Sequence, residues 1–150
     1  MTVYDLEHIF AVDPGDKHVG IAEWNLNWGR YEMRSWEIDA DKAPAWIDRR
    51  LTSGVQTLVI EEFKLYKGKA TAQAGSNMLT SEMIGALKWI ASVYNVPVVL
   101  QPAAIKVPTR AQCVARNLEW KDRRSNHASD ARLHAFYYLL RKRKVAKCPT

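Results

Sequence analysis

Residues 8–25, HIFAVDPGDKHVGIAEWN, constrain the fold more than any other stretch of the chain. A short apolar run over residues 9–12 stops at Asp13, a Pro-Gly turn follows, and a second apolar run occupies residues 19–22. Short apolar runs separated by turn residues are typical of two paired strands. Asp13 then lies where a buried strand ends, and a carboxylate there is costly unless a cation meets it. This placement is typical of a metal ligand, especially where further carboxylates converge.

The remaining chain alternates between strand and helix patterns. Strands are predicted over residues 9–12, 19–22, 31–38, 57–60 and 96–100. Helices are predicted over residues 39–50, 79–94, from a cap at Thr109 to about 118, and over 127–141 after a cap at Ser125 or Asn126, with a loop over 63–76. An antiparallel start followed by alternating strands and helices predicts an α/β fold, a mixed sheet with helices on both faces. No linker divides the chain, so we expect one domain over residues 1–150 with a basic tail from about residue 142.

Size and composition are typical of a globular domain. The chain has 150 residues, enough to bury a substantial core. No apolar run approaches the roughly 20 residues of a membrane span, and the N-terminus lacks the pattern of a signal peptide. Two cysteines form neither a disulfide scaffold nor a CxxC metal site. We therefore expect a reducing, cytoplasmic setting and no membrane partner.

Charge is distributed unevenly along the chain. The net charge is +6, but residues 101–150 hold 12 Lys and Arg against 3 Asp and Glu, whereas residues 1–100 carry a balance of −3. A basic half on a patterned domain indicates a polyanionic partner such as nucleic acid. A solubilising basic run over residues 141–144 explains the charge equally well, so charge alone leaves both readings open.

Carboxylates are predicted at the ends of three elements: Asp13, Glu61 and Asp130. His127 lies three residues before Asp130, so both lie on one face of a helix. Carboxylates from distant parts of a chain can hold two divalent cations about 4 Å apart, which activate water in phosphodiester hydrolysis. Oxygen ligands favour Mg²⁺ or Mn²⁺, and one imidazole is compatible with either ion. Each acid alone also fits a plain turn, strand end or helix start.

Taken in order, these motifs resemble the RuvC-like Holliday junction resolvases of the RNase H-like superfamily. The segment AVDPGDKHVGIA contains Asp13 and resembles the family's first strand and turn, and LVIEEF places Glu61 at the catalytic Glu position. The segment HASDA places Asp130 at the final catalytic acid, and His127 where many members carry Asp and some carry His. PAAIK, which ends at Lys106, resembles the segment that supplies a basic residue near the scissile phosphate.

The resemblance implies an RNase H-like five-stranded mixed sheet and a metal-dependent endonuclease. Such an enzyme resolves four-way junctions by paired nicks and acts as a homodimer on branched DNA, with flaps and forks left open as further substrates. The source implied is a bacterial cell or a phage-infected host. Two Mg²⁺ or Mn²⁺ ions per site are expected on Asp13, Glu61, His127 and Asp130, and Lys106 is expected to complete the catalytic set. Side chains alternate along a strand, so only one of Glu61 and Glu62 can face this site, and register with the family favours Glu61.

DNA contacts are expected from basic and aromatic residues in loops that flank the catalytic motifs. These residues are Lys64, Tyr66, Lys67, Lys69, Arg123 and Arg124. Asp16 and Asp122 are predicted to be solvated loop acids. His8, His18 and His134 have no matching partner in the sequence and are predicted to be structural.

Two other functions stay open at this stage. The segment DPGDKHVGIA also resembles the opening of the YqgF-type nucleases, which act on RNA, although HASDA and the Lys106 segment favour the resolvases. A non-catalytic nucleic-acid-binding module would retain the fold and lose its acids, whereas Asp13, Glu61 and Asp130 are all present.

Overall fold

The computed structural model describes residues 7–28, 32–64 and 74–145, with side chains described for residues 7–28, 32–64 and 79–142. Within these residues the strands are β1 (His8–Asp13), β2 (His18–Asn25), β3 (Met33–Asp39), β4 (Thr57–Glu62) and β5 (Val98–Pro102). The helices are α1 (Ala43–Leu51), α2 (Ala74–Val93), α3 (Lys106–Ala115) and α4 (Asn126–Val145), and the 3-10 turns are η1 (Leu26–Trp28) and η2 (Ala103–Ile105).

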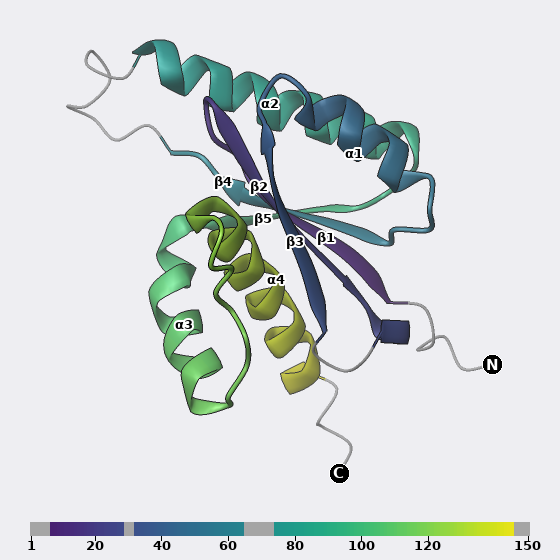
Figure 1. Cartoon of the computed structure of the whole chain (residues 1–150). Coiled ribbons are helices and arrows are strands. Elements are labelled where there is room, and N and C mark those ends of the chain that lie inside the picture. Colours follow the sequence, from purple (N-terminus) through teal and green to yellow (C-terminus); the bar gives the residue numbers. More distant parts are fainter. Residues whose placement is uncertain (1–6, 29–31, 65–73, 146–150) are drawn as a thin grey trace.

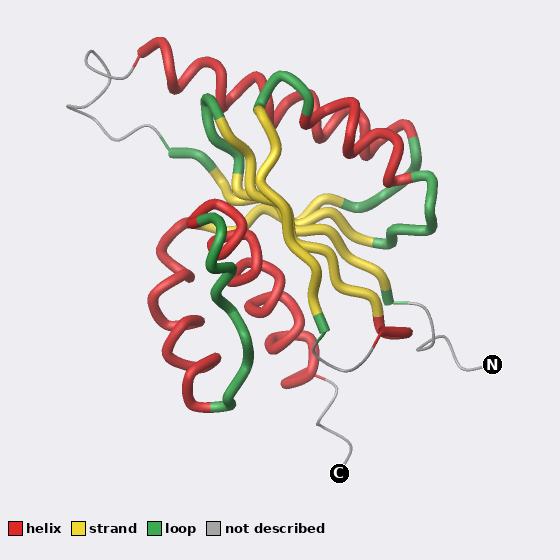
Figure 2. The backbone as a smooth tube through the Cα atoms, viewed as in Figure 1, coloured by secondary structure: helices red, strands yellow, loops and turns green. Residues whose placement is uncertain are grey.

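The strands form one mixed sheet in the order β3-β2-β1-β4-β5. The first three strands are antiparallel, and β4 and β5 run parallel to β1. Helices α1 and α2 cover one face, and α3 and α4 cover the other (Figure 1). Figure 2 shows the strands as a twisted layer between the two helical layers. The predicted α/β mixed sheet with helices on both faces is confirmed.

Alternation along β1 divides the core between the two faces. Phe10 and Val12 pack among α1 and α2, whereas Ile9 and Ala11 pack against α4. All four side chains are buried because helices cover both faces of this central strand. No helix within the described residues is long and apolar enough to cross a membrane.

The pairing register places two acids on the same face. Ala11 of β1 pairs with Val59 of β4, and both face α4. Asp13 and Glu61 each follow two residues later, so alternation puts them on the α4 face, at the carboxyl ends of adjacent parallel strands. Glu62 therefore faces the opposite side, and Glu61 is the acid that lies on the face of Asp13.

Helix α4 begins in direct contact with β2. A Cβ built on Gly20 would lie 1.9 Å from the carbonyl oxygen of His127, so only glycine permits this approach. The Ser125 hydroxyl accepts a hydrogen bond from the Ala128 amide at 3.0 Å, as expected of the predicted N-cap. The first turn of α4 is thereby fixed next to the end of β1.

Several predicted boundaries are wrong by a few residues. Helix α2 already includes residues 74–76, which were predicted to be loop, and α4 continues to Val145 into the predicted tail. Strand β5 begins at Val98, because α2 is closed by a hydrogen bond from the Val96 amide to the Ala91 carbonyl, with Asn95 at φ 54°.

The predicted cap at Thr109 is also wrong. The turn η2 leads directly into α3 at Lys106, with Ile105 already in helical conformation, so no capped entry precedes Thr109. Pro108 fits the first turn of α3, where its missing N–H has no partner to lose. Thr109 is buried inside the helix, and its hydroxyl has no hydrogen-bond partner among the described residues.

Candidate active site

Five side chains predicted to be catalytic meet where β1, β4, α3 and α4 converge. The Nδ1 of His127 donates a hydrogen bond to Oδ2 of Asp13 at 3.0 Å. The Nζ of Lys106 lies 3.0 Å from Oε2 of Glu61 and 3.0 Å from Oδ2 of Asp130. The structure therefore brings together residues that are up to 114 positions apart in the chain.

Asp13 is the most enclosed of the three acids, and its side chain is 8% exposed. Burial raises the pKa of Asp13, and the negative charges of Glu61 and Asp130 raise it further. The hydrogen bond from His127 and the positive charge of Lys106 oppose this rise without cancelling it. The three carboxylates thus lie close enough to repel one another, as ligands of a shared cation would.

His127 joins Asp13 to the first turn of α4. The hydrogen bond to Asp13 raises the pKa of His127 more than burial lowers it. A Cβ built on Gly15 would lie 2.3 Å from the carbonyl oxygen of His18 and 3.5 Å from Cε1 of His127, so the glycine keeps the turn tight against this ring.

Lys106 is the positive charge that two of the acids share. Burial lowers the pKa of Lys106, but hydrogen bonds to Asp130 and Glu61 outweigh burial and raise it. Lys106 was predicted to lie near a reacting phosphate, and in this structure its ammonium group instead bridges two carboxylates. Its side chain is 22% exposed and thus open to a ligand.

Glu61 is held from a second side by His134, whose Nε2 donates to Oε2 of Glu61 at 2.7 Å. Burial raises the pKa of Glu61, but the hydrogen bonds from His134 and Lys106 outweigh it and lower the pKa. His134 was predicted to be structural because the sequence offered it no matching partner, and its contact with Glu61 was not predicted. Its position four residues after Asp130 was the available signal, because i and i+4 share a helix face.

The donor set suits a hard divalent cation, with three carboxylates and one imidazole around a site of mutually repelling charges. As the chain is folded here, no three His, Cys, Asp or Glu side chains among the described residues form a group that could hold a metal ion. Glu61 and Asp130 instead share the ammonium group of Lys106. The residue chemistry therefore fits a metal, while the protein's own cation joins two of the acids.

The predicted DNA-binding residues fall into three groups. Lys64 is exposed beside Glu62, with 3.7 Å between its Nζ and Oε2 of Glu62. Arg123 is exposed in the loop between α3 and α4. Arg124 is bound to Asp122 through both Nε and Nη2, at 3.1 and 2.9 Å. The other three, Tyr66, Lys67 and Lys69, lie outside the described residues.

Asp122 was predicted to be a solvated loop acid, and this prediction is wrong. Its carboxylate is buried and accepts hydrogen bonds from Arg124 and from the Ser35 hydroxyl, the latter at 2.8 Å. These bonds, those from Arg124 above all, hold the pKa of Asp122 well below its usual range. The acid joins the loop before α4 to strand β3.

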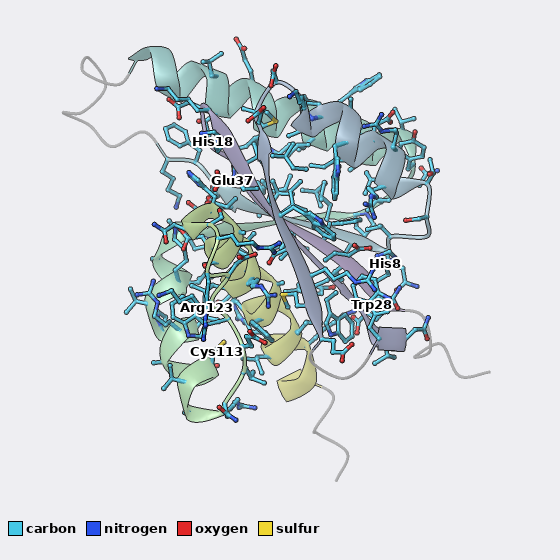
Figure 3. All side chains as sticks on the ribbon, viewed as in Figure 1. His8, His18, Trp28, Glu37, Cys113 and Arg123 are labelled. Carbon is cyan, nitrogen blue, oxygen red and sulfur yellow. The ribbon has the colours of Figure 1, made fainter. Side chains whose placement is uncertain are left out.

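His8 and His18 also have partners. His8 is buried and its Nε2 donates to Oε1 of Glu23 at 2.7 Å. The Nδ1 of His18 lies 3.7 Å from carboxylate oxygens of Glu37 and Asp39. Figure 3 shows His18 and Glu37 side by side at one end of the sheet, with His8 at the other. The ring centroids of His18 and His127 are 6.4 Å apart, which identifies the first as the active-site end.

No protein-family model and no curated protein matches this sequence. Among solved structures, the chain resembles Thermus thermophilus RuvC in complex with Holliday junction substrate, with a TM-score of 0.62 at 16% identity over 91% of this chain and 96% of that chain. A second T. thermophilus RuvC structure has a TM-score of 0.60 at 15% identity, over 92% and 96% of the two chains. Fowlpox virus resolvase, in complex with substrate Holliday junction DNA, has a TM-score of 0.55 at 14% identity, over 94% and 99%. These likenesses show that the chain has the RuvC-like, RNase H-like fold that its motifs predicted.

Proposed function

We propose that this RuvC-like fold is that of a metal-dependent endonuclease that resolves four-way DNA junctions by hydrolysing phosphodiester bonds. The observation that carries the proposal is the geometry at the ends of β1 and β4 and the first turn of α4. There His127 contacts Asp13 at 3.0 Å, and Lys106 lies 3.0 Å from both Glu61 and Asp130. Junction resolvases with this fold support the choice of substrate. Flaps and forks stay possible substrates.

Asp13, Glu61 and Asp130, with His127, are the residues that would hold Mg²⁺ or Mn²⁺. Two such ions, when bound, activate a water molecule and stabilise the leaving oxygen. The Lys106 ammonium has three N–H donors, and the contacts to Glu61 and Asp130 use two of them. The third can donate to a phosphate oxygen of the substrate, as predicted from the sequence.

Arg123 and Lys64 are exposed cations, in the loop before α4 and shortly after β4, and we propose that they contact the DNA backbone. Arg124 and Asp122 hold the α3–α4 loop in place, which presents Arg123 to a ligand without reorganisation. Arg124 keeps Nη1 for a phosphate, since its contacts to protein within the described residues use Nε and Nη2. Tyr66, Lys67 and Lys69 stay proposed contacts in the segment after Glu62.

Paired nicks need two active sites, and we propose a homodimer that contacts through α2. Leu79, Trp89 and Val93 project from one side of this helix and are 54%, 69% and 55% exposed. Trp89 and Val93 are one helical turn apart, and neighbouring exposed apolar side chains are typical of an interaction surface. A second copy of the chain would cover them.

The test is a cleavage assay on labelled four-way junction, flap, duplex and RNA, with and without Mg²⁺ or Mn²⁺. We expect metal-dependent cleavage of the junction. Asp13→Asn should abolish cleavage and retain binding, because the change leaves the basic surface intact. Cleavage that survives Asp13→Asn contradicts the proposed site.

The same assay separates the two alternatives. Cleavage of RNA in preference to junctions would favour a YqgF-type nuclease. Binding of junctions without cleavage, in the presence of either ion, would favour a non-catalytic nucleic-acid-binding module.

A further inference from the structure

A line of three hydrogen-bonded side chains runs from the core to the candidate active site. His134 of α4 is 0% exposed and lies between Glu61 of β4 and Gln101 of β5. Its Nε2 is 2.7 Å from Oε2 of Glu61, and its Nδ1 is 2.8 Å from Oε1 of Gln101. Glu61 and Gln101 are register partners on the adjacent strands, so one imidazole reaches both.

The part of α4 that carries His134 is fully buried. Leu133, Ala135 and Phe136, the residues next to it in the sequence, are apolar and 0% exposed. A buried imidazole is costly unless its nitrogens find partners, and an apolar residue would pack here without that requirement. The two partners of His134 are a carboxylate of the candidate site and a buried amide. These partners indicate that His134 serves the site rather than the packing of the core.

We propose that His134, supported by Gln101, is a positioning residue that fixes the carboxylate of Glu61 for metal binding; this inference rests on the proposed function. Both contacts of Glu61, from His134 and Lys106, fall on Oε2. Within the described residues Oε1 accepts no hydrogen bond, so it is the oxygen left for a ligand. Lys106 is partly exposed and can turn to a substrate, whereas His134 is enclosed and keeps Glu61 in place.

The proton arrangement follows from the partners. The carboxylate only accepts, so Nε2 of His134 carries a proton. The Gln101 amide then either accepts from a protonated Nδ1 or, with its oxygen and nitrogen exchanged, donates to a neutral ring. In both cases the amide fixes the orientation of the ring. Loss of such outer partners of a metal ligand typically costs about 10–100-fold in metal affinity or activity.

The test measures Mn²⁺ binding by electron paramagnetic resonance without DNA, and kcat and KM on a four-way junction. His134→Leu removes the donor, and His134→Gln keeps an N–H group at nearly the position of Nε2. We expect His134→Leu to weaken Mn²⁺ binding and to lower kcat by about 10–100-fold, with KM for the junction nearly unchanged. His134→Gln should recover most of both losses, which a purely structural role would not produce.

The chain offers a matched control at the other end of the sheet. His8 donates from Nε2 to Oε1 of Glu23 at the same 2.7 Å, and both residues are buried. His8→Leu should therefore lower the free energy of unfolding about as much as His134→Leu does, and should leave the Mn²⁺ affinity and kcat unchanged. If His134→Leu does not fold, Gln101→Leu tests the same support, and we expect a smaller loss in the same direction.

Two outcomes overturn the inference and are distinguishable. Wild-type protein that binds Mn²⁺ and cleaves junctions, with a His134→Leu or Gln101→Leu variant that matches His8→Leu in both readouts, refutes the positioning role alone. Wild-type protein that neither binds Mn²⁺ nor cleaves refutes the proposed function, and the positioning role with it.

Discussion

Asp13 shows at the scale of one residue how a buried carboxylate can lower the stability of the fold that contains it. Its pKa is raised above the ordinary 3.8, so the folded chain holds this proton more tightly than the unfolded chain does. Ionised Asp13 therefore opposes folding at neutral pH, and that opposition disappears once the pH falls below the unfolded value. A bound divalent cation would offset it.

Asp13→Asn is accordingly expected to stabilise the metal-free protein at pH 7. Each kcal/mol of relieved repulsion should raise Tm by about 2–4 °C, and the gain should shrink as the pH falls toward 4. Thermal unfolding in the presence of a chelator measures this gain in Tm. Asp16→Asn is the control, because Asp16 is an exposed acid in the turn after β1. Addition of Mg²⁺ should raise the Tm of wild type more than that of the variant. A lower Tm for Asp13→Asn in the chelator contradicts this account.

Asp122 is the opposite case, an ionised acid that the fold stabilises. Its folded pKa lies below the ordinary 3.8, so its contribution is present above that pH and is lost as the pH falls further. Asp122→Ala leaves Ser35 and Arg124 without their shared acceptor and should cost about 2–4 kcal/mol of unfolding free energy at pH 7. Urea unfolding at pH 7 and pH 3 measures it, and the difference from wild type should be smaller at pH 3. If wild type and Asp122→Ala differ in unfolding free energy by the same amount at pH 7 and pH 3, the ionised form of Asp122 does not stabilise the fold.

These residues also show which contacts can be predicted from the sequence and which cannot. Asp13 contacts His127, and Lys106 contacts Glu61 and Asp130, at the strand ends and the helix face that local patterns predicted. That these residues form one catalytic site stays a prediction. The bonds from His134 to Glu61 and from Ser35 to Asp122 were missed, since they join residues 73 and 87 positions apart and depend on how α4 and the preceding loop pack on the sheet. The bond from Arg124 to Asp122 spans only two positions, but a pair of charges in a loop does not by itself indicate burial.

At the scale of elements, the approach of α4 to β2 determines the geometry of the site. The first turn of α4 carries His127 and rests directly on Gly20, beside Asp13 of the neighbouring strand. In the sequence, Gly20 was recognised only as part of the segment AVDPGDKHVGIA. The reason for it became visible once α4 was placed, just as the cap predicted at Thr109 failed because η2 runs straight into α3.

Gly20→Ala is expected to force α4 away from the sheet. The new Cβ would lie 1.9 Å from the His127 carbonyl oxygen and 2.8 Å from the Ala128 amide nitrogen, and both neighbours are backbone. We expect a loss of about 1–3 kcal/mol or more in unfolding free energy. Gly85→Ala is the matched control, because a Cβ there meets no atom within 4 Å and the residue lies inside α2. That change should stabilise by roughly 0.5–1 kcal/mol. If urea unfolding shows that the unfolding free energy changes in the same direction in both variants, the proposed role of Gly20 is contradicted.

At the scale of the whole molecule, the candidate active site and the apolar stripe of α2 lie on opposite faces of the sheet. Figure 1 shows α2 and α4 on opposite faces of the sheet. The register puts Asp13 and Glu61 on the α4 face, whereas the exposed Leu79, Trp89 and Val93 belong to α2. A second copy that docks on α2 would therefore leave both sites uncovered. This arrangement is compatible with one dimer that cuts two strands.

Trp89→Glu tests this arrangement. The new carboxylate would be buried without a partner in the proposed dimer contact, which should prevent the dimer from forming. Since Trp89 is 69% exposed in the single chain, the variant should fold with an unchanged Tm at low concentration. Sedimentation should show a dimer for wild type and a monomer for Trp89→Glu. On a junction the monomer should release singly nicked product, because its two cuts are no longer made within one complex. Val107→Glu, at an equally exposed apolar position of α3 (73%), should leave the dimer and the paired cuts intact. A Trp89→Glu protein that sediments as a dimer would place the contact elsewhere on the surface.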